Sequence, residues 1–156
     1  MSLEIYTDGG CMPNPGIGGW AAVFLENQKR IKTISGNTKQ TTNSRMELTA
    51  VIEALFTLKT STSLSVYSDS QYVLSGIADW SVKWVKNNWN LNKSGTKKVK
   101  NIDLWEQLVL LNEMHEIEWY WVKAHSGDVE NEFVDSLATE EIQKVIRSSG
   151  NKVRFY

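Results

Sequence analysis

The feature that most constrains the fold is a strand, a helix and a second strand in succession, with both strands ending on an aspartate. Residues 3–8 read LEIYTD and residues 64–69 read LSVYSD, and both alternate apolar and polar side chains as half-buried strands do. Between them, residues 43–59 carry apolar side chains at the spacing of an amphipathic helix: Leu48, Val51, Ile52, Leu55 and Leu58. Strands joined by such a crossover normally lie parallel and often adjacent. We therefore expect Asp8 and Asp69 side by side at the sheet edge where ligands of open α/β proteins bind.

The remaining pattern also favours an α/β fold. Residues 19–26 and 29–38 read as two further strands, in hairpins with the first. The stretch Gly9–Gly19 is rich in glycine and proline and predicts a loop. Beyond residue 69 the pattern predicts three short helices, a strand and a last long helix, in that order, near residues 70–76, 80–87, 101–112, 116–122 and 131–146.

Composition limits the class of protein. A chain of 156 residues with 41% hydrophobic and 22% charged residues is typical of one globular domain, so residues 1–156 are taken as one unit. It has no apolar run of membrane-spanning length and no basic or apolar leader, and Cys11 is its single cysteine. These features predict a cytoplasmic protein without a membrane partner. The net charge of −1 argues against non-specific coating of nucleic acid but leaves room for a local basic patch.

Two more carboxylates point toward the same sheet edge. Glu47 lies at the border of the apolar stripe of the first long helix, and Asp135 lies in the first turn of the last one. Four carboxylates from two strands and two helices suit hard cations such as Mg²⁺. A pair of such ions can bind the attacking and leaving oxygens of a phosphodiester together. The pattern predicts metal-assisted phosphoryl chemistry.

Each of these acidic residues also has an ordinary structural explanation. Asp69 and Ser70 together could cap the helix that follows them. Glu47 could complete a capping box with Ser44. Asp135 could simply favour the dipole of its helix. It is the combination of four carboxylates with the surrounding sequence that favours a site.

Five segments together resemble the type 1 ribonuclease H family. They read YTDGGCMPNPGIGGWA, TTNSRMELTAVIEAL, YSDSQYV, VKNIDLW and WVKAHSGDVENEFVDSLA, they occur in the family's order, and they are distributed over most of the chain, from residue 6 to residue 138. The resemblance implies a ribonuclease H-like fold, a five-stranded mixed sheet of three antiparallel and two parallel strands with flanking helices. It implies endonucleolytic cleavage of the RNA strand of RNA–DNA hybrids, leaving 5′-phosphate and 3′-hydroxyl ends. Two Mg²⁺ ions, with Mn²⁺ as a possible substitute, and a monomeric state are implied as well.

The resemblance also assigns catalytic residues. It gives Asp8, Glu47, Asp69 and Asp135 as metal ligands and His125 as a mobile-loop histidine that relays protons or helps product to leave. Asn131 would orient the loop or the attacking water, although its position before a helix is equally typical of a cap.

The family's substrate contacts carry over to a second set of residues. Those that would face the minor groove, where the RNA 2′-hydroxyl is exposed, are Cys11, Asn14, Asn43, Ser44 and Gln71. Thr42 and Asn101 would hold a DNA phosphate. Turn chemistry alone would explain Asn14 and Asn43 equally well.

Residues 80–102 match the family's basic protrusion. The stretch has no acidic residue and carries six lysines interleaved with tryptophans, which together favour a nucleic-acid patch. Trp80, Lys83 and Lys86 are the expected contacts. Trp84 and Trp89 are expected to be mainly packing residues.

Two other functions fit part of the pattern. An integrase-like or resolvase-like nuclease would share the acidic cluster, but such proteins normally lack the minor-groove loops and the basic stretch. A binding module that no longer cuts would be favoured by the loss of a carboxylate, yet all four are present. The tail of residues 148–156 ends in an alternating KVRFY, which could extend a sheet edge or touch substrate. His115 has no functional context and is expected to be structural.

Overall fold

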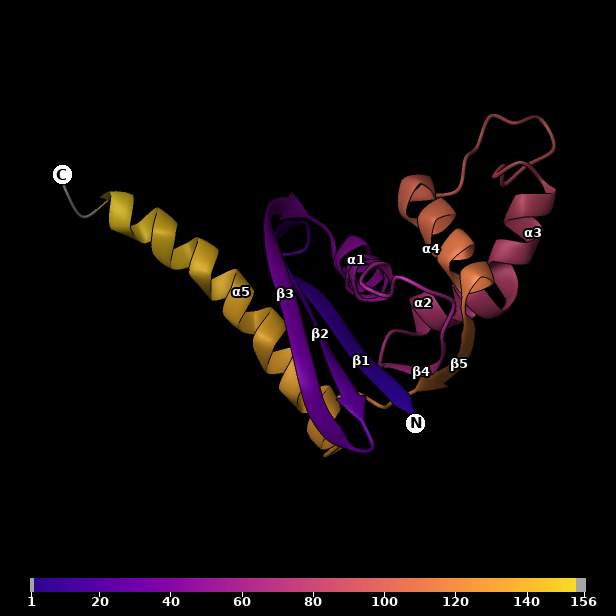
Figure 1. Cartoon of the computed structure of the whole chain (residues 1–156). Coiled ribbons are helices and arrows are strands. Elements are labelled where there is room, and N and C mark those ends of the chain that lie inside the picture. Colours follow the sequence, from indigo (N-terminus) through magenta and orange to yellow (C-terminus); the bar gives the residue numbers. More distant parts are fainter. Residues whose placement is uncertain (1, 154–156) are drawn as a thin grey trace.

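The structure, a computed structural model, describes the backbone of residues 2–153 and the side chains of residues 2–148. Five strands form one sheet in the order β3-β2-β1-β4-β5 (Figure 1). Their bounds are β1 Leu3–Met12, β2 Gly16–Glu26, β3 Lys29–Thr41, β4 Ser63–Ser68 and β5 Glu116–Trp121.

The strand pairing confirms the arrangement expected from the sequence. Strands β1 and β4 are parallel neighbours, and their pairing runs as far as Thr7 and Ser68, one residue before each aspartate. Strand β2 pairs antiparallel with β1 on one side and with β3 on the other, while β5 is parallel to β4. The result is the five-stranded mixed sheet that the family resemblance implied.

The helices divide between the two faces of the sheet. Helix α5 lies alone along one face, whereas the other helices gather on the opposite face and beside β5 (Figure 1). Their bounds are α1 Asn43–Phe56, α2 Gln71–Ser75, the π-helical turn η1 Gly76–Trp80, α3 Ser81–Lys86, α4 Ile102–Met114 and α5 Val129–Val153. Among the residues that the structure describes, no helix is both long and apolar enough to cross a lipid bilayer.

Two apolar cores hold these layers together. The larger one lies between the sheet and helices α1 and α4, where Ile5, Leu55 and Trp105 are fully buried. The smaller one lies under α5, where Val134 and Ala138 pack on the inner residues of β2. Both helices that carry a predicted ligand, α1 and α5, are therefore fixed against the sheet by buried apolar side chains.

The loop predicted for Gly9–Gly19 is wrong in extent. Strand β1 continues to Met12 and β2 begins at Gly16, so that only residues 13–15 connect them. Two of these glycines allow close packing of helices on the sheet. A Cβ on Gly9 would lie 2.3 Å from the carbonyl carbon of Met46 in α1, and one on Gly19 would lie 2.2 Å from the carbonyl oxygen of Ala138 in α5. Asp8 consequently lies inside a strand, at the point where its pairing with β4 stops.

The long helices also differ from their expected bounds. Helix α1 ends at Phe56 rather than near residue 59, and α5 begins at Val129 rather than near residue 131. Helix α5 continues through Lys152 and Val153, so these two residues do not extend a sheet edge. Residues 154–156 lie outside the described part of the chain.

Candidate active site

Four elements converge where the pairing of β1 with β4 ends. Asp8 comes from β1, Asp69 follows β4, Glu47 lies on the first turns of α1 and Asp135 on α5. Asp8 and Asp135 also line one small cavity with Cys11 and Thr139. The sheet and its two packed helices thus bring carboxylates that are distant in the sequence into one neighbourhood.

Asp8 is the most strongly perturbed of the four. Burial, the nearby charge of Asp69 and a hydrogen bond with Asp135 raise the pKa of its carboxyl from 3.8 to about 9. Burial disfavours the charged form, and close carboxylates cannot all remain ionised without a compensating charge. Asp8 therefore holds a proton at neutral pH when no cation is present.

Glu47 approaches the other carboxylates from the face of the sheet that α1 covers, opposite to α5. Burial raises the pKa of its carboxyl to about 7, and the charge of Asp69 acts in the same direction. A hydrogen bond with Ser70 lowers the pKa and so favours the ionised form. Ser70 thereby links Glu47 to the end of the strand that carries Asp69.

The donor set fits a hard divalent cation, although no finished coordination shell is present. Across the described side chains, no three acidic, histidine or cysteine residues are arranged so as to hold a metal ion. What the site offers is carboxylate oxygens from four elements, and their burial and mutual repulsion raise the pKa of Asp8 and Glu47. A divalent cation would relieve that repulsion by replacing a proton, which is the usual linkage between metal binding and pKa.

Asn131 belongs to this carboxylate group. It is buried, and its Nδ2 donates a hydrogen bond of 3.3 Å to Oδ2 of Asp69. The alternative reading of Asn131 as a helix cap is wrong, because the Asp128 carboxylate accepts from the Asn131 backbone N–H and caps α5 itself. Asn131 is therefore placed to hold Asp69 in position.

The capping alternatives for the other residues have mixed outcomes. Ser70 does cap α2, since its Oγ accepts from the Val73 backbone N–H at 3.2 Å. The cap of α1 is Thr42, whose Oγ1 accepts from the Arg45 N–H at 3.3 Å, so the capping box suggested for Ser44 with Glu47 is not formed. Glu47 is thus left free to face Asp69.

The two histidines lie in contrasting surroundings. His125 is exposed in the connection between β5 and α5, in a left-handed backbone conformation with φ 56°. Such a conformation is uncommon outside glycine and marks a turn that Gly127, with φ 94°, extends. His115 is buried, and its Nδ1 accepts from the Thr62 backbone N–H at 3.2 Å, which fits the structural role expected for it.

The residues expected at the minor groove gather beside the carboxylates. Asn43 and Ser44 begin α1, and the Asn14 side chain accepts from the Asn43 backbone N–H at 3.1 Å. Asn14, Asn43 and Gln71 are exposed, whereas Cys11 is buried and its Sγ donates to the carbonyl groups of Pro13 and Thr41. Cys11 thus supports the loop and offers little surface to a ligand.

A polar network around Asn101 was not anticipated from the sequence. Arg45 forms a paired hydrogen bond with the Asp103 carboxylate, at 3.0 and 2.7 Å, and also donates to the Asn101 side chain at 3.1 Å. Asn101 in turn donates to the Tyr72 hydroxyl at 3.1 Å. The network orients the Asn101 amide between Arg45 and Tyr72. It depends on the packing of α1 against α4, so no local sequence pattern predicts it.

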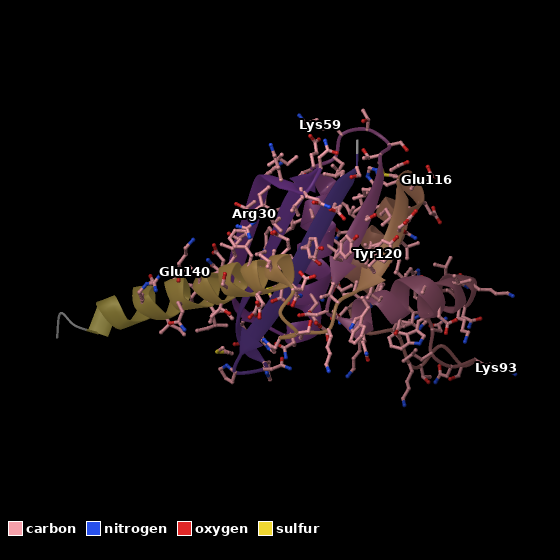
Figure 2. The ribbon with its side chains drawn as sticks, turned by 90° about the horizontal axis from the view of Figure 1, so that it is seen from below. Arg30, Lys59, Lys93, Glu116, Tyr120 and Glu140 are labelled. Carbon is pink, nitrogen blue, oxygen red and sulfur yellow. The ribbon has the colours of Figure 1, made fainter. Side chains whose placement is uncertain are left out.

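The basic protrusion of residues 80–102 stands away from the sheet. Figure 2 shows Lys93 at its tip, far from Lys59 at the opposite end of the molecule. Trp84 and Trp89 pack against the larger core as expected, while Trp80 is 38% exposed. Lys83 lies 3.9 Å from Asp79, just before the stretch, so its charge is partly balanced.

The RNase H family model matches residues 1–143. The chain belongs to the RNase H family. Similar sequences include a protein named ribonuclease H from Orientia tsutsugamushi, 46% identical over 99% of this chain and 92% of its own length. Another ribonuclease H, from a Wolbachia of Drosophila simulans, is 52% identical over 90% of this chain and 94% of its own length.

Solved structures extend the family relationship to the fold. The crystal structure of LC9-RNase H1, described as a type 1 RNase H with the type 2 active-site motif, has a TM-score of 0.80 and 26% identity, and covers 91% of this RNase H chain and 72% of its own. LC11-RNase H1 in complex with an RNA/DNA hybrid has a TM-score of 0.73 at 20% identity, covering 93% of this chain and 99% of its own. At that identity the second likeness concerns the fold alone.

Proposed function

We propose that this RNase H family chain is an endonuclease that hydrolyses the RNA strand of RNA–DNA hybrids and leaves 5′-phosphate and 3′-hydroxyl ends. The observation that carries the proposal is the convergence of Asp8 with Asp69 and Asp135 at a buried position, where burial and the two neighbouring carboxyl groups together raise the pKa of Asp8 to about 9. The name ribonuclease H of the relatives and the hybrid bound by LC11-RNase H1 support the choice of substrate.

Asp8, Glu47, Asp69 and Asp135 would hold two Mg²⁺ ions, for which Mn²⁺ is a possible substitute. When bound, such ions activate a water nucleophile and neutralise charge on the leaving oxygen. The chain's own part is to supply the oxygen ligands and to hold them in place. Asn131 fixes Asp69 through its 3.3 Å hydrogen bond, and Ser70 fixes Glu47.

His125 would move protons at the edge of the site. It is exposed in the turn between β5 and α5, where its side chain is in contact with bulk water. Histidine can both accept and donate a proton through its two ring nitrogens.

Substrate would be recognised at two places. Asn14, Asn43, Ser44 and Gln71 would read the minor groove next to the carboxylates, where the RNA 2′-hydroxyl is presented. Thr42 and Asn101 would hold a phosphate of the DNA strand, with the Asn101 amide oriented by Arg45 and Tyr72. Because Cys11 is buried, we assign it to supporting this surface and expect its own contact with substrate to be through its backbone.

The protrusion would grip the DNA strand electrostatically, with Trp80, Lys83 and Lys86 at its base. The whole chain would act as one ribonuclease H domain, a monomer in the cytoplasm. The single cysteine, which is buried, is compatible with that reducing compartment.

The test is a comparison of three duplexes of the same sequence: an RNA–DNA hybrid, double-stranded DNA and double-stranded RNA. We expect cleavage of the RNA strand of the hybrid alone, in Mg²⁺, and none with a chelator. Cleavage of all three duplexes would indicate a different nuclease of the same fold. Tight binding of the hybrid without cleavage would indicate a binding module.

A further inference from the structure

Three tyrosines form a ladder across the sheet, outside the carboxylate site. Strand register places Tyr6, Tyr67 and Tyr120 in one row across β1, β4 and β5. The rings of Tyr6 and Tyr67 stack with centroids 4.4 Å apart and planes within 7°, and those of Tyr67 and Tyr120 stack at 5.0 Å and 18°. The ladder begins under α5, against which Tyr6 packs, and ends on the edge strand, where Tyr120 is 41% exposed.

A row of polar residues lies beside the ladder on the same face of the sheet. Each of them precedes the tyrosine of its strand by two residues. The register pairs Glu4 with Ser65, and Ser65 with Glu118. Neighbouring strands lie about 4.8 Å apart, so Glu4 and Glu118 stand about 10 Å from each other on the same face. Glu116 lies on β5 two residues before Glu118 and on the same face.

These carboxylates are held in place by neutral donors. The Tyr67 hydroxyl donates to Glu4 at 2.9 Å, the Tyr120 hydroxyl donates to Glu118, and Ser63 Oγ donates to Glu116 at 2.9 Å. Within side chains 2–148, none of the three forms an ion pair with a lysine, arginine or histidine. Each is oriented by its neighbour and keeps its negative charge uncompensated.

The surface is open to a partner. Helix α5 packs on β1, β2 and β3, and in the described part of the chain no helix spreads over β4 and β5 on that face (Figure 1). Tyr120 and Glu116 both stand on β5, away from α5 (Figure 2). A hollow of about 350 Å³ lies at the start of these strands, between Ser63, Ser65, Glu116 and Glu118.

We propose that this tyrosine–glutamate face, formed by Tyr67, Tyr120, Glu4, Glu116 and Glu118, binds a short arginine- and lysine-rich segment of another protein. Among the described side chains, Tyr67 is the only aromatic ring stacked on Tyr120, and Tyr120 is 41% exposed, so the outer face of its ring can receive a guanidinium group. The oriented carboxylates suit the paired hydrogen bonds of arginine. The same negative charge disfavours nucleic acid, which the lysines of the protrusion attract on another part of the molecule.

The test uses the full-length, ¹⁵N-labelled chain and acetylated hexa-arginine amide as the probe, at low salt. We expect amide shifts centred on Ser65, Tyr67, Glu118 and Tyr120, with a Kd on the order of tens of micromolar because exposed ion pairs are individually weak. Glu116→Gln with Glu118→Gln should weaken binding at least about fivefold. Tyr120→Ser should weaken it as well, and Tyr120→Phe, which keeps the ring, should bind more tightly than Tyr120→Ser.

The matched control is Glu106→Gln with Glu113→Gln, which removes the same charge from exposed positions on α4. It should leave the affinity for the probe unchanged, and both double variants should keep the melting temperature and hybrid cleavage of the parent chain. The proposal is overturned by shifts centred on Asp8 and Asp69, by equal weakening in both double variants, or by no binding at millimolar probe. Self-association of the chain that Glu116→Gln with Glu118→Gln abolishes would assign the face to a second copy and also overturn it.

Discussion

At the scale of single residues, the proton on Asp8 connects the fold to the chemistry. Its carboxyl is buried beside Asp69 and Asp135, and these surroundings raise its pKa to about 9. The folded chain must therefore either hold a proton there or bind a cation. A residue whose charge is costly in the metal-free state but useful with metal is typical of functional sites.

Replacing Asp8 with asparagine should stabilise the metal-free chain. Because the pKa of Asp8 is higher in the folded than in the unfolded state, stability falls as pH rises from about 4 toward 9. Asp8→Asn removes that loss. The free energy of unfolding should therefore increase only slightly at pH 5 and by about 1–3 kcal/mol at pH 8. Thermal melts with a chelator at both pH values measure it. The exposed Asp79→Asn is the control, and a large drop in melting temperature for Asp8→Asn would contradict the assignment.

Metal binding should release protons. At pH 7 a cation would displace the proton of Asp8 and part of that of Glu47, whose pKa is raised to about 7. Affinity for Mg²⁺ should therefore rise between pH 6 and pH 9. Calorimetry in buffers of different ionisation enthalpy counts the protons. The count should fall by about one in Asp8→Asn if that variant still binds metal, and a pH-independent affinity would argue against the linkage.

At the scale of elements, close packing of α1 on β1 positions Glu47. A Cβ on Gly9 would meet the backbone of Met46 and Glu47 at 2.3–2.6 Å, whereas a Cβ on Gly10 would meet nothing within 4 Å. Gly9→Ala should displace the start of α1, with a loss of stability of about 1–3 kcal/mol and a fall in hybrid cleavage. Gly10→Ala is the matched control for stability. Equal melting temperatures in the two variants would show that this contact does not position α1.

The protrusion should contribute a salt-dependent part of hybrid binding. Removing Lys93, Lys97 and Lys98 together should weaken binding most at low salt and reduce the slope of log K against log[salt] by about 2–3. Lys59→Ala, at the opposite end of the molecule, should leave the slope unchanged (Figure 2). Fluorescence anisotropy of a labelled hybrid, measured from about 50 to about 300 mM salt, gives the slope for each variant. An unchanged slope in the triple variant would place the grip elsewhere.

At the scale of the whole molecule, periodicity predicted the strand segments, because strand and helix periods differ, and the crossover rule predicted that β1 and β4 are parallel neighbours. The rule also predicted that Asp8 and Asp69 are neighbours. The single five-stranded mixed sheet was implied by the family resemblance. The prediction of a loop at Gly9–Gly19 was wrong in extent. A glycine that allows a helix to pack closely on a strand cannot be told apart, in the sequence, from a glycine in a loop. The sequence suggested Asn131 as a possible cap of α5, whereas the cap is Asp128. It also gave no sign of the contacts of Arg45, which depend on the packing of α1 against α4.

The family resemblance added what periodicity lacks, namely a substrate. Side chains that are polar for many reasons, such as Asn14 and Gln71, acquire a role only when the substrate is known. The structure then separates them by burial, because Asn14 and Gln71 are exposed and Cys11 is buried.

The central claim is that carboxylates brought together from distant parts of the chain cut RNA paired with DNA. Its most direct test is cleavage of a hybrid with both strands labelled, in Mg²⁺, by the parent chain and by Asp8→Asn under identical conditions. We expect the parent chain to cut the RNA strand and spare the DNA, and Asp8→Asn, still folded, to be slower by on the order of 10³-fold. Comparable rates for the two proteins would contradict the account.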